Sequence, residues 1–207
     1  MSKSKPLIAI LDYQAGNIKS VENALVHSGA EVVITSDVTT IENSDAIVFP
    51  GQGSCDSSMA NIKSKGLDTV IKEAISSRKP FLGICVGLQL LFDTSEEGDV
   101  DCLGIVGGEV KRFVNELKVP HMGWNEVTFS IKHPVFSGIP DNSHFYFVHS
   151  YYAIPTDVKL IASTTNYGIE FCSSIAFDNT IAVQFHPEKS GEIGLKMYKN
   201  FVDFINL

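Results

Sequence analysis

Residues 79–92 read KPFLGICVGLQLLF, and the organisation of the chain follows from this stretch. The apolar run Pro80–Ile84 predicts a buried strand, and the residues from Val86 to about Phe92 predict a helix. Between them, Gly83-x-Cys85-x-Gly87 places a cysteine on a tight turn from strand to helix. Small residues on each side let the backbone turn and let a neighbouring segment approach. We therefore predict an α/β fold that carries Cys85 as a nucleophile.

The alternative for Cys85 is a thiol buried in the core, which is the common fate of a free cysteine. Two features of the turn favour the nucleophile. The helix that follows is expected to direct N–H groups and a partial positive charge at the sulfur, which stabilises the thiolate. The N–H of Val86 is also expected to bind a developing oxyanion. A thiol nucleophile needs a base, which must come from elsewhere in the chain.

The first half of the chain alternates short apolar runs with helical patterns. Strands are expected at Leu7–Leu11, Glu31–Thr35, Ala46–Phe49 and Phe81–Ile84, and helices at Asn17–His27, Ser57–Lys65 and Leu67–Ser76. Short apolar strands separated by helices indicate a mostly parallel sheet with helices on both faces.

The second half consists of strand patterns joined by turn residues. They lie at Val110–Phe113, Glu126–Phe129, His144–His149, Leu160–Thr164, Ser174–Phe177 and Ile181–Phe185, before a last helix at about Gly191–Ile205. These strands suggest antiparallel additions to the sheet. Because no repeat or long linker interrupts the pattern, we expect residues 1–207 to form a single domain.

The candidate base lies in IAVQFHPEKSG, where the strand Ile181–Phe185 leads into His186 and Glu188. In an extended segment, residues two apart project to the same side. Pro187 fixes its own φ and biases His186 towards an extended conformation. Glu188 can then accept a hydrogen bond from one imidazole nitrogen while the other nitrogen faces Cys85, which is the logic of a catalytic triad. The alternative is a loop turn with a solvated glutamate.

A glycine-containing loop, PGQG, follows the strand Ala46–Phe49. A nucleotide-binding fingerprint is excluded, because a third glycine is missing and the strand is the wrong one for that motif. Gly51 and Gly53 instead allow the backbone to turn an N–H towards a carbonyl bound over Cys85, and the Gln52 N–H is the expected donor. The alternative is a plain surface turn.

Composition restricts the remaining possibilities. The chain has 207 residues and a formal net charge of −8, which argues against nucleic acid or an anionic membrane as the main partner. The apolar run near the N-terminus is too short for a signal peptide, so we expect a cytoplasmic protein whose four cysteines are thiols. No CxxC pair occurs, and we expect neither a metal site nor a cofactor.

The motifs PGxG, GxCxG and HPE, in this order, resemble the class I glutamine amidotransferase family. Four further segments resemble one subfamily, the glutaminase subunits of imidazole glycerol phosphate synthases: LDYQAGNIKSV, KVPHMGWNEV, FYFVHSYY and QFHPEKSG. With them, the match extends over nearly the whole chain. The resemblance implies a flavodoxin-like fold with added antiparallel strands. It also implies hydrolysis of glutamine through a γ-glutamyl thioester and transfer of ammonia to a (β/α)₈-barrel cyclase subunit, in histidine biosynthesis.

The resemblance also implies roles for residues outside the triad. The residues implied to bind glutamine are Gln89, Glu97, Ser150 and Tyr151, and those implied to face the cyclase subunit are Trp124, Asn125, Tyr146 and Lys189. Trp124 and Tyr146 could instead be ordinary core aromatics. In one departure from the family, Gln52 stands where valine is usual. Two other functions stay open: a non-catalytic regulatory subunit, and a paralogous glutaminase that feeds another sugar or nucleotide pathway.

Overall fold

The computed structural model describes residues 5–14, 16, 18–114 and 116–206. Parallel strands form the centre, in the spatial order β2 (Glu31–Thr35), β1 (Leu7–Leu11), β3 (Ala46–Phe49), β4 (Phe81–Ile84) and β13 (Thr180–Val183). The residues of β3, β4 and β13 are all buried. Runs such as AIVF and TIAV therefore lack the polar alternation of a strand with one face in water.

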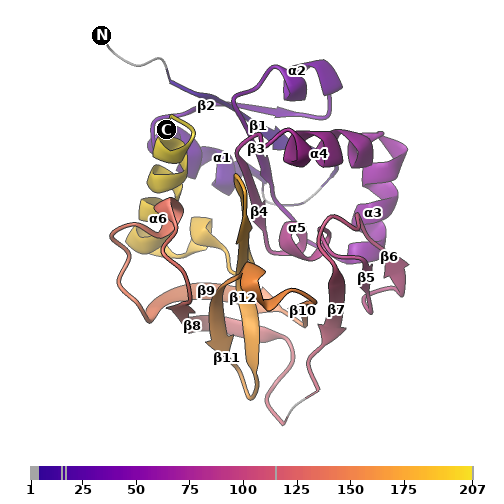
Figure 1. Cartoon of the computed structure of the whole chain (residues 1–207), viewed down its shortest axis with the longest axis vertical. Coiled ribbons are helices and arrows are strands. Elements are labelled where there is room, and N and C mark those ends of the chain that lie inside the picture. The colour runs from indigo at the N-terminus through magenta and orange to yellow at the C-terminus, as the bar shows by residue number, and fades with distance from the viewer. Residues whose placement is uncertain (1–4, 15, 17, 115, 207) are drawn as a thin grey trace.

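Helices cover both faces of this parallel sheet (Figure 1). One face carries α1 (Ile18–His27) and α6 (Gly191–Phe204), and the other carries α2 (Val38–Glu42), α3 (Cys55–Ser64) and α4 (Leu67–Ser76). Helix α4 buries Leu67, Val70, Ile71, Ala74 and Ile75. This spacing of three and four residues gives the helix a single apolar face, which packs on the sheet.

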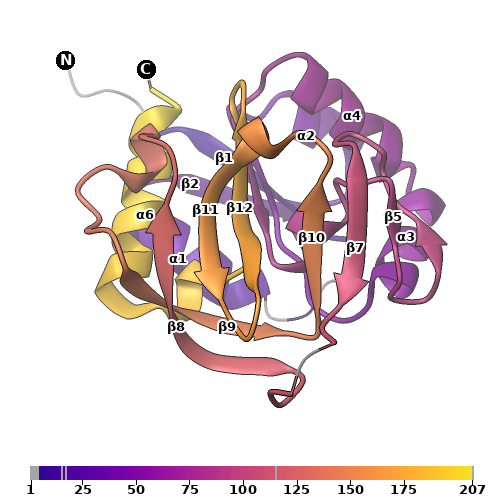
Figure 2. The ribbon, with the colours of Figure 1, turned by 60° about the horizontal axis from the view of Figure 1, so that its bottom comes forward.

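Mostly antiparallel strands extend the sheet beyond β13, as the second half of the sequence predicts, although β5 pairs with β7 in parallel (Figure 2). They continue through β12 (Glu170–Phe177), β10 (Tyr151–Pro155) and β7 (Gly108–Arg112) to the short strands β5 (Thr94–Ser95) and β6 (Val100–Asp101). A branch leads from β12 through β11 (Ile161–Asn166) and β8 (His121–Phe129) to β9 (Ser143–His149). The predicted α/β fold, a parallel core with added antiparallel strands, is confirmed.

The helix after Cys85 is shorter than predicted. Helix α5 spans Val86–Gln89, a single turn, and does not reach Phe92. After Gln89 the backbone tightens, because the N–H groups of Leu91 and Phe92 donate to carbonyls three residues back, and the carbonyls of Leu90–Phe92 accept from residues 103–106. A single turn sums few peptide dipoles, so the helix gives the sulfur of Cys85 less support than the sequence suggests.

Several other boundaries differ from the prediction. Strand β8 begins at His121 and not at Glu126, because its first half pairs with β9. Helix α2 and the strands β5, β6 and β10 were not predicted, and α3 begins earlier, at Cys55. The remaining elements are the 3₁₀ turns η1 (Pro134–Phe136), η2 (Val158–Leu160) and η3 (Pro187–Lys189). Asn17, the predicted first residue of the first helix, lies outside the described residues. Across the described part of the chain, no helix combines the length and apolar character needed to cross a membrane.

Candidate active site

Cys85 occupies the sharp turn between β4 and α5 in a conformation that side chains rarely adopt. Its φ and ψ are 54° and −111°, a positive φ that is uncommon for a residue other than glycine. The Cys85 N–H donates to the carbonyl of Val183 on β13 at 2.7 Å, which holds the turn against the sheet. Strained conformations of this kind concentrate at functional sites. The predicted elbow is confirmed.

The two glycines of the elbow are required by close packing. A Cβ at Gly87 would lie 2.0 Å from the carbonyl oxygen of Phe49, and one at Gly83 would lie 2.9 Å from the Cβ of Ala182. The first of these contacts is with backbone, which cannot rotate away. Gly87 therefore lets the end of β3 approach the elbow closely, and Gly83 lets β13 do so.

The variant Gly87→Ala is expected to lower the free energy of unfolding by about 3 kcal/mol, because the added methyl group overlaps the Phe49 carbonyl. Urea unfolding followed by circular dichroism measures the difference. Gly107→Ala is the matched control, since its nearest neighbour would be the Thr156 hydroxyl at 3.8 Å. Equal effects of the two substitutions would contradict the packing argument.

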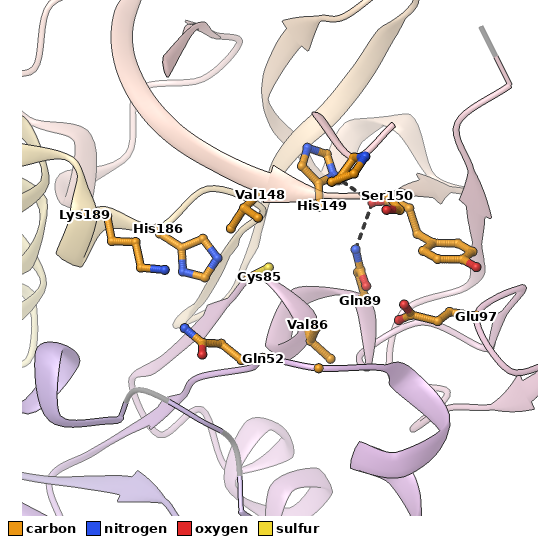
Figure 3. Close-up of a pocket in the computed structure, with 13 residues that line it drawn as sticks. Gln52, Cys85, Val86, Gln89, Glu97, Val148, His149, Ser150, His186 and Lys189 are labelled. Atoms are coloured by element: carbon orange, nitrogen blue, oxygen red, sulfur yellow. Dashed lines mark hydrogen bonds between the residues drawn. The ribbon is translucent and has the colours of Figure 1, made fainter. Parts of the chain in front are cut away.

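His186 and Glu188 form a buried pair at the end of β13. Nδ1 of His186 lies 2.8 Å from Oε1 of Glu188, and each side chain is only 2% exposed. The Tyr198 hydroxyl donates to the other carboxylate oxygen at 3.4 Å. Nε2 of His186 is buried without a hydrogen-bond partner among the described residues, and the ring lies beside Cys85 (Figure 3). Glu188 thus orients the imidazole towards the sulfur.

The charge balance around His186 favours its protonated form. Burial lowers the pKa of His186, but the negative charges of Cys85 and Glu188 outweigh burial and raise the pKa to about 10. A protonated His186 places a positive charge beside the position where the sulfur acts as a nucleophile.

The backbone between His186 and Glu188 corrects one prediction. His186 is extended, with φ −106° and ψ 94°, as the following proline favours. Residues Pro187–Lys189 form the 3₁₀ turn η3, however, and not an extended segment. Proline is favourable at the first position of a helical turn, because an N–H at that position would have no partner within the turn. The turn, not strand alternation, brings the carboxylate back to the imidazole.

A cavity of about 330 Å³ opens over Cys85 (Figure 3). Three residues without a predicted role line it, namely Pro120, Val148 and His149. The other lining residues were all singled out from the sequence: Gln52, Gly53, Cys85, Val86, Gln89, Glu97, Ser150, Tyr151, His186 and Lys189. They come from the loop after β3, from α5, from the segment around β5, from the β9–β10 turn and from the end of β13. Segments distant in sequence therefore meet at the carboxyl ends of β3, β4 and β13, where ligands bind in α/β sheets.

The loop after β3 forms the wall next to the nucleophile. The Tyr13 hydroxyl donates to the carbonyl of Pro50 and holds the start of the loop. A Cβ at Gly51 would lie 2.4 Å from the backbone nitrogen of Gly87, so this glycine packs directly on the first turn of α5. Gly53 has a φ of 95°, which favours glycine. The loop thus packs against the first turn of α5, beside Cys85.

The family model for class I glutamine amidotransferases matches residues 9–204 of the chain. The chain belongs to this family. An imidazole glycerol phosphate synthase subunit HisH from Dehalococcoides mccartyi is 50% identical, over 94% of this chain and 96% of the relative. A subunit of the same name from Aromatoleum aromaticum is 49% identical, over 95% and 98% of the two chains.

Solved structures show that the amidotransferase shares the fold of distant relatives. PurLQS from Thermotoga maritima matches with a TM-score of 0.78 and 17% identity, over 97% of this chain and 99% of that chain. A glutamine amidotransferase from the same organism matches with a TM-score of 0.64 and 17% identity, over 89% and 77%. Identities this low inform on the fold alone.

The residues implied to face a partner lie apart from those that line the cavity, except Lys189. Trp124 on β8 and Tyr146 on β9 are direct cross-strand partners, and their rings meet edge to face at a centroid distance of 6.2 Å. The Nζ atom of Lys189 lies 5.9 Å from the centre of the Tyr146 ring. Trp124 is 56% exposed, so it is not a core aromatic. In the amidotransferase these three side chains form a cluster that reaches from the exposed Trp124 to Lys189 at the cavity.

Sequence reasoning missed polar residues that support the site. Gln184 donates to the sulfur of Cys85 over 3.6 Å and accepts from Nε2 of Gln89 at 2.9 Å. The Cys55 thiol donates to Oε1 of Gln89, and the Cys55 N–H donates to Glu97 at 2.9 Å. Gln184 lies two residues before His186, but no short motif marks it. These contacts depend on α3, α5 and β13 coming together.

His121 and His149 were also left without a role. Both are buried, and burial lowers the pKa of His121 to about 4 and that of His149 to about 3. Both side chains are therefore neutral at physiological pH. A buried neutral histidine that is hydrogen-bonded through both nitrogens, as these are, holds one fixed tautomer.

The free energy of unfolding is expected to fall as the pH drops from about 6.5 towards 4, because His121 and His149 bind protons in the unfolded chain but not in the folded one. The unfolded state binds more protons in this window, so stability rises with pH, by up to about 1.4 kcal/mol per pH unit for each histidine. Urea unfolding at several pH values measures the slope. The double variant His121→Asn/His149→Asn should show a smaller slope, and an unchanged slope would contradict the assignment.

Proposed function

We propose that this chain is the glutaminase subunit of an imidazole glycerol phosphate synthase. It would hydrolyse glutamine to glutamate and ammonia and pass the ammonia to a (β/α)₈-barrel cyclase subunit in histidine biosynthesis. The observation that carries the proposal is the buried Cys85, His186 and Glu188 constellation at the floor of a cavity large enough for an amino acid. The identities of 50% and 49% with HisH subunits over nearly the whole chain support the choice of pathway.

The first chemical step is attack on the carboxamide of glutamine. His186 holds the proton of Cys85, and the sulfur attacks the γ-carbonyl carbon to give a tetrahedral oxyanion. The N–H groups of Val86 and Gln52 are proposed to bind this oxyanion, since both residues line the cavity beside the sulfur. His186 then gives its proton to the departing nitrogen, and ammonia leaves behind a γ-glutamyl thioester.

The second step releases glutamate. Water attacks the thioester while His186 accepts one of its protons, and the carbon–sulfur bond breaks to restore Cys85. Glu188 stabilises the imidazolium in both steps through its 2.8 Å contact with Nδ1. The chemistry needs no cofactor.

The substrate is proposed to bind along the cavity wall opposite His186. Gln89 and Glu97 would bind its polar groups, with the carboxylate of Glu97 facing the α-ammonium group. The backbone of Ser150 and Tyr151 would bind the α-carboxylate. These residues line the same cavity as Cys85, which supports the assignment.

The residues Trp124, Asn125, Tyr146 and Lys189 are proposed to face the cyclase subunit. Tryptophan and tyrosine are enriched at interface hot spots, and Lys189 also lines the cavity. We further propose that residues 1–207 form one domain that works in the cytoplasm. The cytoplasmic location is supported by cysteines that are free thiols, as expected in a reducing compartment: Cys55, Cys85, Cys102 and Cys172.

Growth without histidine tests the pathway. The gene is expected to restore growth of a bacterial strain that lacks its own glutaminase subunit, when it is expressed together with the cyclase gene from the same source. The Cys85→Ala gene, expressed at the same level, should fail at low ammonium and succeed at high ammonium. Failure of the unaltered pair to support growth, with both proteins soluble, would favour a paralogous pathway.

A further inference from the structure

A chain of side-chain hydrogen bonds runs from β8 to the cavity. Nδ2 of Asn125 lies 3.2 Å from Nε2 of His121, and Nδ1 of His121 lies 2.9 Å from Nε2 of His149. Nδ1 of His149 lies 2.8 Å from the carbonyl oxygen of Tyr151, whose backbone lines the cavity. His121 and His149 face each other as direct cross-strand partners of β8 and β9.

The direction of every bond in this chain is determined by its two ends. The Tyr151 carbonyl can only accept, so Nδ1 of His149 carries the proton and Nε2 accepts. Nδ1 of His121 must then donate to His149, and its own Nε2 accepts from the amide of Asn125. The other hydrogen of that amide goes to the carbonyl of Asn166, and Oδ1 accepts from the N–H of Glu126. Both histidines are therefore held as the Nδ1–H tautomer.

The surroundings keep both rings neutral and fixed. The ring of His121 is stacked between Tyr167 and Phe147, at centroid distances of 4.0 and 4.8 Å. Phe171 packs on His149 at 5.2 Å. Burial lowers the pKa of each histidine. A ring that is neutral at physiological pH and packed on aromatic side chains keeps its hydrogen bond to the backbone in one geometry.

At the cavity, the Tyr151 carbonyl receives a second donor. Nε2 of Gln89 binds the same oxygen at 2.9 Å, and Figure 3 shows His149 and Gln89 converging on it. The same amide group reaches Gln184, which contacts the sulfur of Cys85. The position of one carbonyl oxygen thus fixes the Ser150–Tyr151 backbone and the amide of Gln89 together.

We propose that His149, held by His121, is a positioning residue that sets the geometry of the glutamine site through the Tyr151 carbonyl. The inference rests on the glutaminase function proposed above. It adds a role for two histidines that do not touch the reacting atoms. Asn125 is the member of this hydrogen-bond network that lies farthest from the cavity along the bonds, and it belongs to the surface proposed to face the cyclase. The same hydrogen bonds therefore couple the geometry of the cavity to that surface.

The test compares three variants in the complex with the cyclase subunit, with glutamate release as the readout. His149→Phe removes the donor to Tyr151 and is expected to raise KM for glutamine about tenfold or more, with a smaller effect on kcat. His149→Asn keeps an N–H near the position of Nδ1 and is expected to restore most of the affinity. Phe147→Leu is the matched control, because Phe147 packs on both rings but makes no side-chain hydrogen bond to them.

Three results would overturn the proposal. They are an unchanged KM in His149→Phe, an equal rise in KM in Phe147→Leu, and no recovery in His149→Asn relative to His149→Phe. Nitrogen chemical shifts of the wild-type imidazoles give an independent readout that does not depend on activity or on the folding of a variant. Protons on Nδ1 of His121 and His149 support the network, and a proton on Nε2 of either contradicts it. If the wild-type complex releases no glutamate, the proposed function fails, and the nitrogen shifts still decide on the network.

Discussion

Replacing Cys85 by alanine is expected to lower glutamine-dependent glutamate release by a factor of about 10⁶, the size of effect seen when a triad nucleophile is removed. No other thiol can substitute, because the side chain of Cys85 stands at the turn beside His186. The measurement is glutamate release by the complex with the cyclase subunit under saturating glutamine. Formation of the cyclase product from added ammonium salt should survive, since that step needs no glutaminase.

Cys172→Ala is the matched control for this experiment. Cys172 is buried on β12, and burial raises the pKa of its thiol to about 12, so it stays protonated and unreactive. Its removal should leave glutaminase activity intact. An electrophilic glutamine analogue should label the wild-type protein and the Cys172→Ala variant, but not the Cys85→Ala variant. Retained glutamate release in Cys85→Ala would refute the assignment of the nucleophile.

Replacing His186 by alanine is expected to reduce kcat for glutamine hydrolysis by a factor of about 10⁴ or more. The variant loses the group that holds the Cys85 proton and later delivers it to the leaving nitrogen. It also leaves the carboxylate of Glu188 buried without its 2.8 Å partner. The initial rate of glutamate release in the complex, with its pH profile, measures the effect.

His144→Ala serves as the control for the base. His144 lies on β9 with its side chain 56% exposed and faces Glu126 at 3.8 Å, on the surface and outside the cavity. Its removal should change kcat by less than about twofold, since substitutions of exposed residues outside the core and the active site have small effects. A comparable loss in the two variants would indicate a general effect on the fold, and wild-type activity in His186→Ala would rule out the triad.

The parallel half of the fold could be predicted from the sequence, because a buried strand produces a recognisable run of apolar residues. Strands β1, β3 and β4 match their predicted bounds, since a strand covered on both faces is a short run of apolar residues between turn residues. The edge strand β2 also matches its predicted bounds, although its residues are only partly buried or exposed. The elbow was also local, because Gly83, Cys85 and Gly87 lie within a few positions. The pairing of β8 with β9 produces a weaker sequence pattern, and the first half of β8 was not predicted for that reason.

The candidate site divides in the same way. Cys85, His186 and Glu188 were identified because their residue types and neighbours are informative one segment at a time. Gln184, Cys55, His121 and His149 were not, because their hydrogen-bond partners lie on other elements. A polar residue in a strand pattern gives no sign of which partner will reach it.

The sequence by itself determined the order of buried strands and helices and the chemistry of the nucleophile, base and acid, since these depend on residues close together in the chain. Only the tertiary structure decided that a one-turn helix and a 3₁₀ turn would hold them. It also decided that Glu188 and Cys85 would surround His186 and raise the pKa of its imidazole despite burial. The reason is that pKa values and hydrogen-bond partners depend on burial and on groups a few ångströms away in space, and those distances exist only once the strands are paired.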